Sequence, residues 1–359
     1  MDDTMTAQPA TLKALTSSSL DPNLVILGLE QTEQLKYLHR IGSRHGFNIT
    51  SRWASTSASL LKTITSPSAG SPHATLANLR FIAVKIITSA NCYYAIDEIL
   101  PGSQTQALTS LKQYNKFNQT FADVFPSKLD DSTGLPSTPG HHLTTIENLG
   151  DGTAFIFSYV ILKRISGKSK LSGNHYPVQF FNTVFIPNDL SRIEYRIDRK
   201  LGRRLCNKAS TELRNEFLGI LAEQRIILQL NTVNFFKAIT NAYDDSSYGR
   251  VVQVDFIDKT GDEDASLKCR TNPKYDARNR AVVNTSQGNT KTISQLEVFG
   301  VAVRFDYHTN QELHHNEIGF ETNRVDWVNR QFCEMFYFEQ SSDNAVHYGV
   351  INDILKRAK

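Results

Sequence analysis

The sequence predicts an α+β fold, with mixed, mainly antiparallel sheets, flanking helices and two domains. Apolar runs of strand length, such as 154–162 and 177–186, are bounded by short turn-forming segments, which is typical of hairpins. Between such runs, apolar residues recur at helical spacing, as in a final helix expected over 344–358. The chain of 359 residues is also longer than one hydrophobic core usually supports, which predicts two domains.

Two polar segments divide the chain into three regions. Residues 66–75 contain two prolines and a glycine, and the sequence DDSSYG occupies 244–249. We therefore expect a flexible tail and a small helical N-terminal region over 1–75, and a central α+β domain over 76–246. A mainly β C-terminal domain with a terminal helix is expected over 247–359.

The first expected elements are short. Residues 24–27 form a strand-like apolar run, and β-branched and aromatic enrichment around 79–100 indicates a hairpin. Between 104 and 121, apolar residues fall on one helical stripe, which predicts a helix packed on a sheet. The expected elements are a strand at 24–27, helices at 30–45 and 57–64, a hairpin at 79–100, a helix at 104–121 and a loop at 126–140.

The strands that follow have the clearest periodicity. The strand at 154–162 is apolar on both faces, which predicts a central strand covered on both sides. The strand at 192–198 alternates, so we expect one set of side chains in the core and the other in solvent. The inward set is Ile193, Tyr195 and Ile197, and the outward set is Arg192, Glu194, Arg196 and Asp198. The other expected elements are strands near 143–149, 177–186, 226–230, 250–258, 293–307, 313–320 and 331–339, and helices at 211–224, 232–243 and 344–358.

Positive charge is concentrated between residues 160 and 208. This segment contains 11 basic and three acidic residues, a net charge of +8, whereas the whole chain has a net charge of only +3. The rest of the chain therefore carries a net charge of −5. Because long-range attraction follows the local field and not the total charge, the segment predicts a polyanionic partner.

The basic segment predicts a nucleic-acid-binding protein, for DNA or RNA, that contacts the phosphate backbone without strong sequence preference. A hairpin loop at 163–170 and a junction at 199–204 would supply most of the charge. Unlike the arginines of the strand at 192–198, the basic residues of the junction are expected to have no acidic partners on a shared solvent face. The candidate nucleic-acid-binding residues are Lys163, Arg164, Lys168, Lys170, Arg192, Arg196, Arg199, Lys200, Arg203 and Arg204. Four aromatic residues among them could stack on unpaired bases, namely Tyr176, Phe180, Phe181 and Tyr195. Such binding would suit DNA metabolism or host defence against mobile elements.

Two other interpretations of the basic segment stay open. The chain could be an interaction subunit whose basic face docks on an acidic protein partner. The charges could also be a solvated rim that serves only solubility, with the aromatic residues in the core. Binding to nucleic acid that weakens steeply with salt would favour the nucleic-acid interpretation over both of these.

A divergent metal-dependent nuclease is a third hypothesis. Such enzymes often hold an aspartate on one strand and, on the next, an acidic residue two positions before a lysine. Asp255 and Lys268 fit this pattern, but Ser266 stands where the second carboxylate is needed. A phosphate loop is not supported at Gly167-Lys168-Ser169, because the glycine required five positions earlier is replaced by Leu162. We therefore predict no catalytic residues.

No metal site and no cofactor are predicted either. Neighbouring side chains on a strand point to opposite faces, so the pairs His141-His142 and His314-His315 are expected to be ordinary surface histidines. The four cysteines lie far apart, which fits a reducing cytosol and a cytoplasmic protein. The N-terminus lacks the charge and the apolar run of a signal peptide, and no run approaches the roughly 20 apolar residues of a membrane span, so no membrane association is expected.

Overall fold

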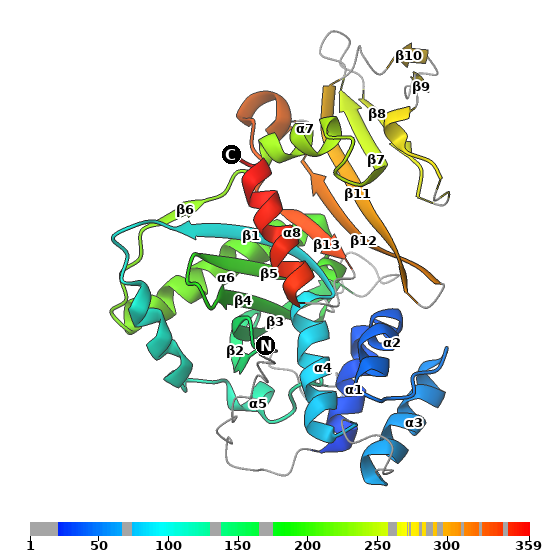
Figure 1. The fold of residues 1–359 in the computed structure, drawn as a ribbon. Coiled ribbons are helices and arrows are strands. Elements are labelled where there is room, and N and C mark those ends of the chain that lie inside the picture. The colour runs from blue at the N-terminus through cyan, green and yellow to red at the C-terminus, as the bar shows by residue number, and fades with distance from the viewer. Residues whose placement is uncertain are drawn as a thin grey trace, which may run out of the picture.

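A large antiparallel sheet with helices on both faces forms the centre of the molecule (Figure 1). The structure is a computed structural model, and it describes residues 21–66, 74–129, 138–164, 175–257, 264–270, 272, 274–279, 282–284, 290–292, 297–309, 312–322, 325–339 and 344–359. Within these residues the sheet has 11 strands, which confirms the predicted α+β class. No helix among them is both long and apolar enough to cross a bilayer.

Four helices build the N-terminal region: α1 (Pro22–Thr32), α2 (Leu35–Arg44), α3 (Trp53–Thr65) and α4 (Leu76–Ser89). Helix α1 begins where the side chain of Asp21 accepts the backbone N–H of Asn23 at 2.8 Å, and Pro22 occupies the first turn. The strand expected at 24–27 is therefore wrong, and the helix expected at 30–45 is divided between α1 and α2. The apolar faces of the four helices enclose a core of their own.

The hairpin expected at 79–100 is wrong in its first half, which forms α4, and only β1 (Asn91–Ile99) is a strand. Leu79 and Ile82 pack into the core of the helical region, whereas Val84 packs against the sheet. A helix buried between two layers is apolar around most of its circumference, so it lacks the single polar face that distinguishes a surface helix from a buried strand.

The sheet follows the order β2, β3, β4, β5, β1, β13, β12, β11, β7, β8, and every pair is antiparallel. Strand β6 pairs with β1 outside this path, and β9 and β10 form a separate ribbon. The bounds of the strands are β2 (Gly140–Asn148), β3 (Gly152–Arg164), β4 (His175–Pro187), β5 (Arg192–Asp198), β6 (Leu230–Thr232), β7 (Arg250–Ile257), β8 (Asp264–Lys268), β9 (Val282–Asn284), β10 (Thr290–Thr292), β11 (Glu297–Thr309), β12 (Glu312–Glu321) and β13 (Phe336–Glu339).

Strand β1 lies between β5 and β13, so the sheet continues across the boundary expected near residue 246. Strands that were assigned to the central and C-terminal domains are thus hydrogen-bonded neighbours. The two largest cores also contain residues from both segments, such as Tyr94 with Phe336, and Tyr195 with Tyr337. The division into a central and a C-terminal domain is therefore not confirmed.

Helix α6 (Arg203–Glu223) covers one face of the sheet, where Phe217 packs against Phe155. Helices α4, α7 (Phe236–Asp244) and α8 (Asn344–Arg357) lie on the opposite face, and Figure 1 shows α8 crossing the middle strands. Strand β3 lies between α6 and α4, which confirms the prediction that it is covered on both sides. The helix expected at 104–121 is replaced by the 3₁₀ helix η1 (Thr105–Gln113) and the short α5 (Gln119–Ala122).

Candidate nucleic-acid interface

The basic residues of β5 are buried and neutralised within the fold. Arg192 and Arg196 are 2% and 3% exposed, and both form ion pairs with the fully buried Glu194, at 2.8 and 2.7 Å. The prediction that these side chains face solvent is wrong, because α4 and α8 cover that side of the strand as α6 covers the other. Their guanidinium groups cannot reach an external phosphate.

The junction after β5 does have acidic partners, contrary to the prediction. Arg199 pairs with Glu339 of β13, and its guanidinium lies 3.8 Å from the centroid of the Tyr337 ring. Lys200 donates to the carbonyl of Thr32 at 2.8 Å and pairs with Glu33 at 3.1 Å. The two side chains diverge, one toward β13 and the other toward the end of α1. Both carboxylates come from distant parts of the chain, so the local sequence gives no sign of them.

Arg203 and Arg204 remain as an exposed pair of cations, which we call the basic turn. They occupy the first turn of α6, and neither makes an ion pair with a carboxylate of the described residues. That turn contains no acidic residue, and the N-cap residue, Gly202, has no side chain that could cap the helix. The positive end of the helix dipole therefore coincides with two positive side chains.

The structure accounts for the other candidates as follows. The ammonium of Lys163 lies 5.2 Å from the centroid of the Phe180 ring. Lys168, Lys170 and the side chain of Arg164 lie outside the described residues. Of the four aromatic residues expected to stack on bases, Phe180, Phe181 and Tyr195 are buried in the core, and Tyr176 alone is exposed. Tyr176 pairs with Lys163 across β3 and β4, so both flank the same end of the sheet.

A pocket that opens to solvent lies beside this end of the sheet, and its space, with the open solvent included, is about 390 Å³. We call it the lysine pocket. It is bounded by the end of α1, the second half of α4, the start of β1 and the end of β5. Its lining residues are Gln31, Thr32, Gln34, Ile86, Ile87, Ala90, Asn91, Cys92, Lys128, Phe181, Asp198 and Lys200. The basic segment of residues 160–208 does not include Lys128, which lies in the loop expected at 126–140. The sequence therefore did not indicate Lys128 as a binding residue.

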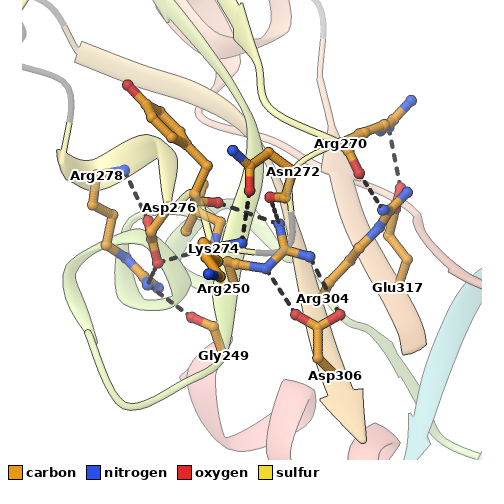
Figure 2. Close-up of polar contacts among 12 residues, drawn as sticks. Gly249, Arg250, Arg270, Asn272, Lys274, Asp276, Arg278, Arg304, Asp306 and Glu317 are labelled. Carbon is orange, nitrogen blue, oxygen red and sulfur yellow. Dashed lines mark hydrogen bonds and ion pairs between the residues drawn. The ribbon is translucent and has the colours of Figure 1, made fainter. Parts of the chain in front are cut away.

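A cluster of four arginines in the second half of the sheet was also missed (Figure 2). Arg304 and Arg270 both pair with Glu317, at 2.6 and 3.1 Å, and Arg250 pairs with Asp306 at 2.7 Å. The fourth, Arg278, holds a turn next to the cluster. Each of these guanidinium groups has a carboxylate partner, but Arg304 and Arg270 share Glu317, so four arginines meet three carboxylates and these ion pairs leave a net charge of +1.

The structure gives no support to a nuclease site. Asp255 accepts the hydroxyl of Ser266 at 2.6 Å, and Ser266 lies directly opposite it in the β7–β8 register. A hydroxyl donor thus occupies the place where the second carboxylate would be required. No group of three or more metal-binding side chains occurs in the part of the chain that the structure describes.

His141 is buried on β2, so the prediction of a surface histidine is wrong at this position. Its Nε2 accepts the side-chain N–H of Asn182 at 2.9 Å, and its ring stacks on Tyr159 at 4.1 Å. Burial lowers the pKa of His141 from 6.5 to about 3. The ring is therefore neutral in the folded chain and becomes protonated on unfolding at mildly acidic pH.

We expect His141 to make the protein less stable as the pH falls below 6.5. Above 6.5 both states are neutral at this residue. Between 6.5 and about 3, only the unfolded state binds the proton, so the free energy of unfolding falls by about 1.4 kcal/mol per pH unit from this group. Urea unfolding of wild type and His141→Phe between pH 5 and 7.5 tests this, since the lost contact with Asn182 shifts the variant equally at every pH. A stability difference that does not change with pH would contradict the prediction.

No protein-family model matches this chain. The curated proteins and the solved structures give no match either. The function must therefore be argued from the geometry and charge of the chain itself.

Proposed function

We propose that the chain binds the phosphate backbone of nucleic acid through the basic turn, Arg203 and Arg204, with Lys163 and Tyr176 as flanking contacts. The observation that supports this proposal is the exposed, unpaired state of the two arginines among the described residues. The proposed interface does not include Arg192, Arg196, Arg199 and Lys200, because carboxylates of the same chain neutralise their charges.

Two cations in the first turn of a helix oppose its dipole and cost about 0.3–1 kcal/mol each in stability. A phosphate placed there would reverse the sign of this interaction, because it meets both guanidinium groups and the free backbone N–H groups of the turn. Contacts of this kind carry no base information, so we propose binding without strong sequence preference. A role in DNA metabolism or in defence against mobile elements would be consistent with such binding.

Salt-dependent binding tests the proposal. Fluorescence anisotropy with labelled single-stranded and duplex DNA and with RNA, over a range of NaCl concentrations, gives the slope of log K against log[salt]. Each lost phosphate contact reduces that slope by about 0.9 on duplex DNA, so Arg203→Ala/Arg204→Ala should flatten it by about 2. The double variant should also bind more weakly at every salt concentration.

The control is Lys36→Ala/Lys62→Ala, which removes the same charge from exposed positions of α2 and α3. It should keep the wild-type slope, because general charge loss does not remove a phosphate contact. If the Arg203/Arg204 variant also keeps it, the proposed contacts are wrong. If no nucleic acid binds at low salt, the function itself is wrong, and co-purification of an acidic protein would favour the docking alternative.

A further inference from the structure

Lys128 presents a cation to the lysine pocket, and no carboxylate of the described residues forms an ion pair with it. Its ammonium lies 5.5 and 6.0 Å from the centroids of the Phe180 and Phe181 rings. No oxygen atom of the described residues accepts a hydrogen bond from it, although the backbone of Lys128 is well held. Burial is the main cause that lowers the pKa of Lys128; the carboxylate of Asp198 acts against this lowering, and the nearby Lys200 adds to it. A charged group in this state costs stability unless an anion joins it.

The position of Lys128 is fixed by side chains from two other elements. Gln31 of α1 accepts the backbone N–H of Lys128 at 2.6 Å, and Gln179 of β4 accepts the next N–H, that of Leu129, at 2.9 Å. The backbone that carries the Lys128 side chain is therefore held in place before any ligand arrives. Such preorganisation lowers the entropy that a binding site loses when it is occupied.

The rest of the pocket defines what could accompany the anion. Ile86, Ile87 and Phe181 form an apolar wall. At the rim, the side-chain N–H groups of Gln34 and Asn91 donate no hydrogen bond to the described residues, so they could serve a ligand. Asp198 is the acidic lining residue, and its Oδ1 accepts the backbone N–H of Lys200 at 2.9 Å.

We propose that the lysine pocket binds a small phosphate monoester, with the phosphate on the Lys128 ammonium and an apolar or aromatic group against Phe181. A lysine ammonium binds phosphate as a point charge. A phosphate monoester carries a charge of about −1.5 to −2 at pH 7, against −1 for a carboxylate, so the ammonium attracts it more strongly. Additional amide donors at the rim suit an anion with three terminal oxygens. The proposal does not depend on nucleic-acid binding, because it uses neither Arg203 nor Arg204.

Calorimetric titration of the full chain with phenyl phosphate, inorganic phosphate and benzoate tests the pocket. We expect saturable binding of phenyl phosphate, weaker binding of inorganic phosphate, and little binding of benzoate. Lys128→Met keeps the length of the side chain and removes its charge, so it should weaken phenyl phosphate binding by about tenfold or more. Lys112→Met, at an exposed position of η1, should bind as wild type does.

Thermal unfolding supplies a second readout. Without ligand, Lys128→Met should unfold at the same or a higher temperature than wild type, because it removes a desolvated cation that donates to no oxygen atom of the described residues. Phenyl phosphate should raise the midpoint of wild type and of Lys112→Met, but not that of Lys128→Met. The proposal is overturned if wild type fails to bind phenyl phosphate at about 10 mM, if Lys128→Met binds it equally, or if benzoate binds as tightly.

Discussion

Replacing Glu194 with alanine is expected to lower the free energy of unfolding by about 3–5 kcal/mol. Glu194 is fully buried, and both of its carboxylate oxygens accept hydrogen bonds from the guanidinium groups of Arg192 and Arg196. Its removal would leave two like charges in a space that excludes water. The other contacts of Arg192 and Arg196, with Asn352 and with the carbonyl of Thr88, are neutral and cannot replace the lost charge.

Equilibrium unfolding in urea measures this loss, and an unchanged m-value would indicate that the folded and unfolded ensembles are otherwise similar. The informative control is the triple variant Arg192→Met/Glu194→Leu/Arg196→Met. Replacing a whole buried ionic group by apolar residues of similar volume is often neutral or stabilising, so this variant should be more stable than Glu194→Ala. If both variants lose the same stability, lost packing and not uncompensated charge explains the effect.

The second large effect is expected at Arg278, where substitution by alanine should cost about 2–4 kcal/mol. Its guanidinium donates to the backbone carbonyls of Ala242 at 2.9 Å, Tyr243 at 2.7 Å, Asp245 at 2.9 Å and Gly249 at 2.8 Å. It also pairs with Asp276 at 2.9 Å (Figure 2). One side chain thus satisfies the carbonyls at the end of α7 and fixes the turn that leads into β7.

Urea unfolding gives the size of this loss, and hydrogen exchange should show faster exchange in α7 and at the start of β7. Arg278→Lys should recover only part of the stability, because an ammonium cannot reach carbonyls on several sides as the planar guanidinium does. Arg330→Ala is the matched control, since Arg330 is 71% exposed and its pair with Asp326 is worth at most about 1 kcal/mol. A loss below that of the control would contradict the assigned role.

Strands β3 and β4 could be predicted because their periodicity is strong and their turn chemistry is local. The outcome for β5 differs between its two faces. Tyr195 is in the core as predicted, but Arg196 is buried as well. Alternation of apolar and charged residues normally indicates one solvated face, and this inference fails where a second helical layer covers that face and a buried carboxylate neutralises the arginines.

The candidate site could be predicted only in part. Arg203 and Arg204 are exposed and have no carboxylate partner among the described residues, as the sequence led us to expect. The sequence around Lys128 did not predict a binding residue, because the neighbouring residues do not show that Lys128 lies in a pocket with Lys200 and Asp198. The charge density of a segment is a property of the chain, whereas a pocket is produced by segments that meet only in the fold.

The sequence by itself determined the α+β class, the hairpin of β2 and β3, the terminal helix and the excess of positive charge between residues 160 and 208. The tertiary structure alone decided which of those charges stay free. Glu33 and Glu339 neutralise Lys200 and Arg199 from sites more than a hundred residues away along the chain. The physical reason is that side-chain periodicity is set by neighbouring residues, while ion pairing depends on distance in space.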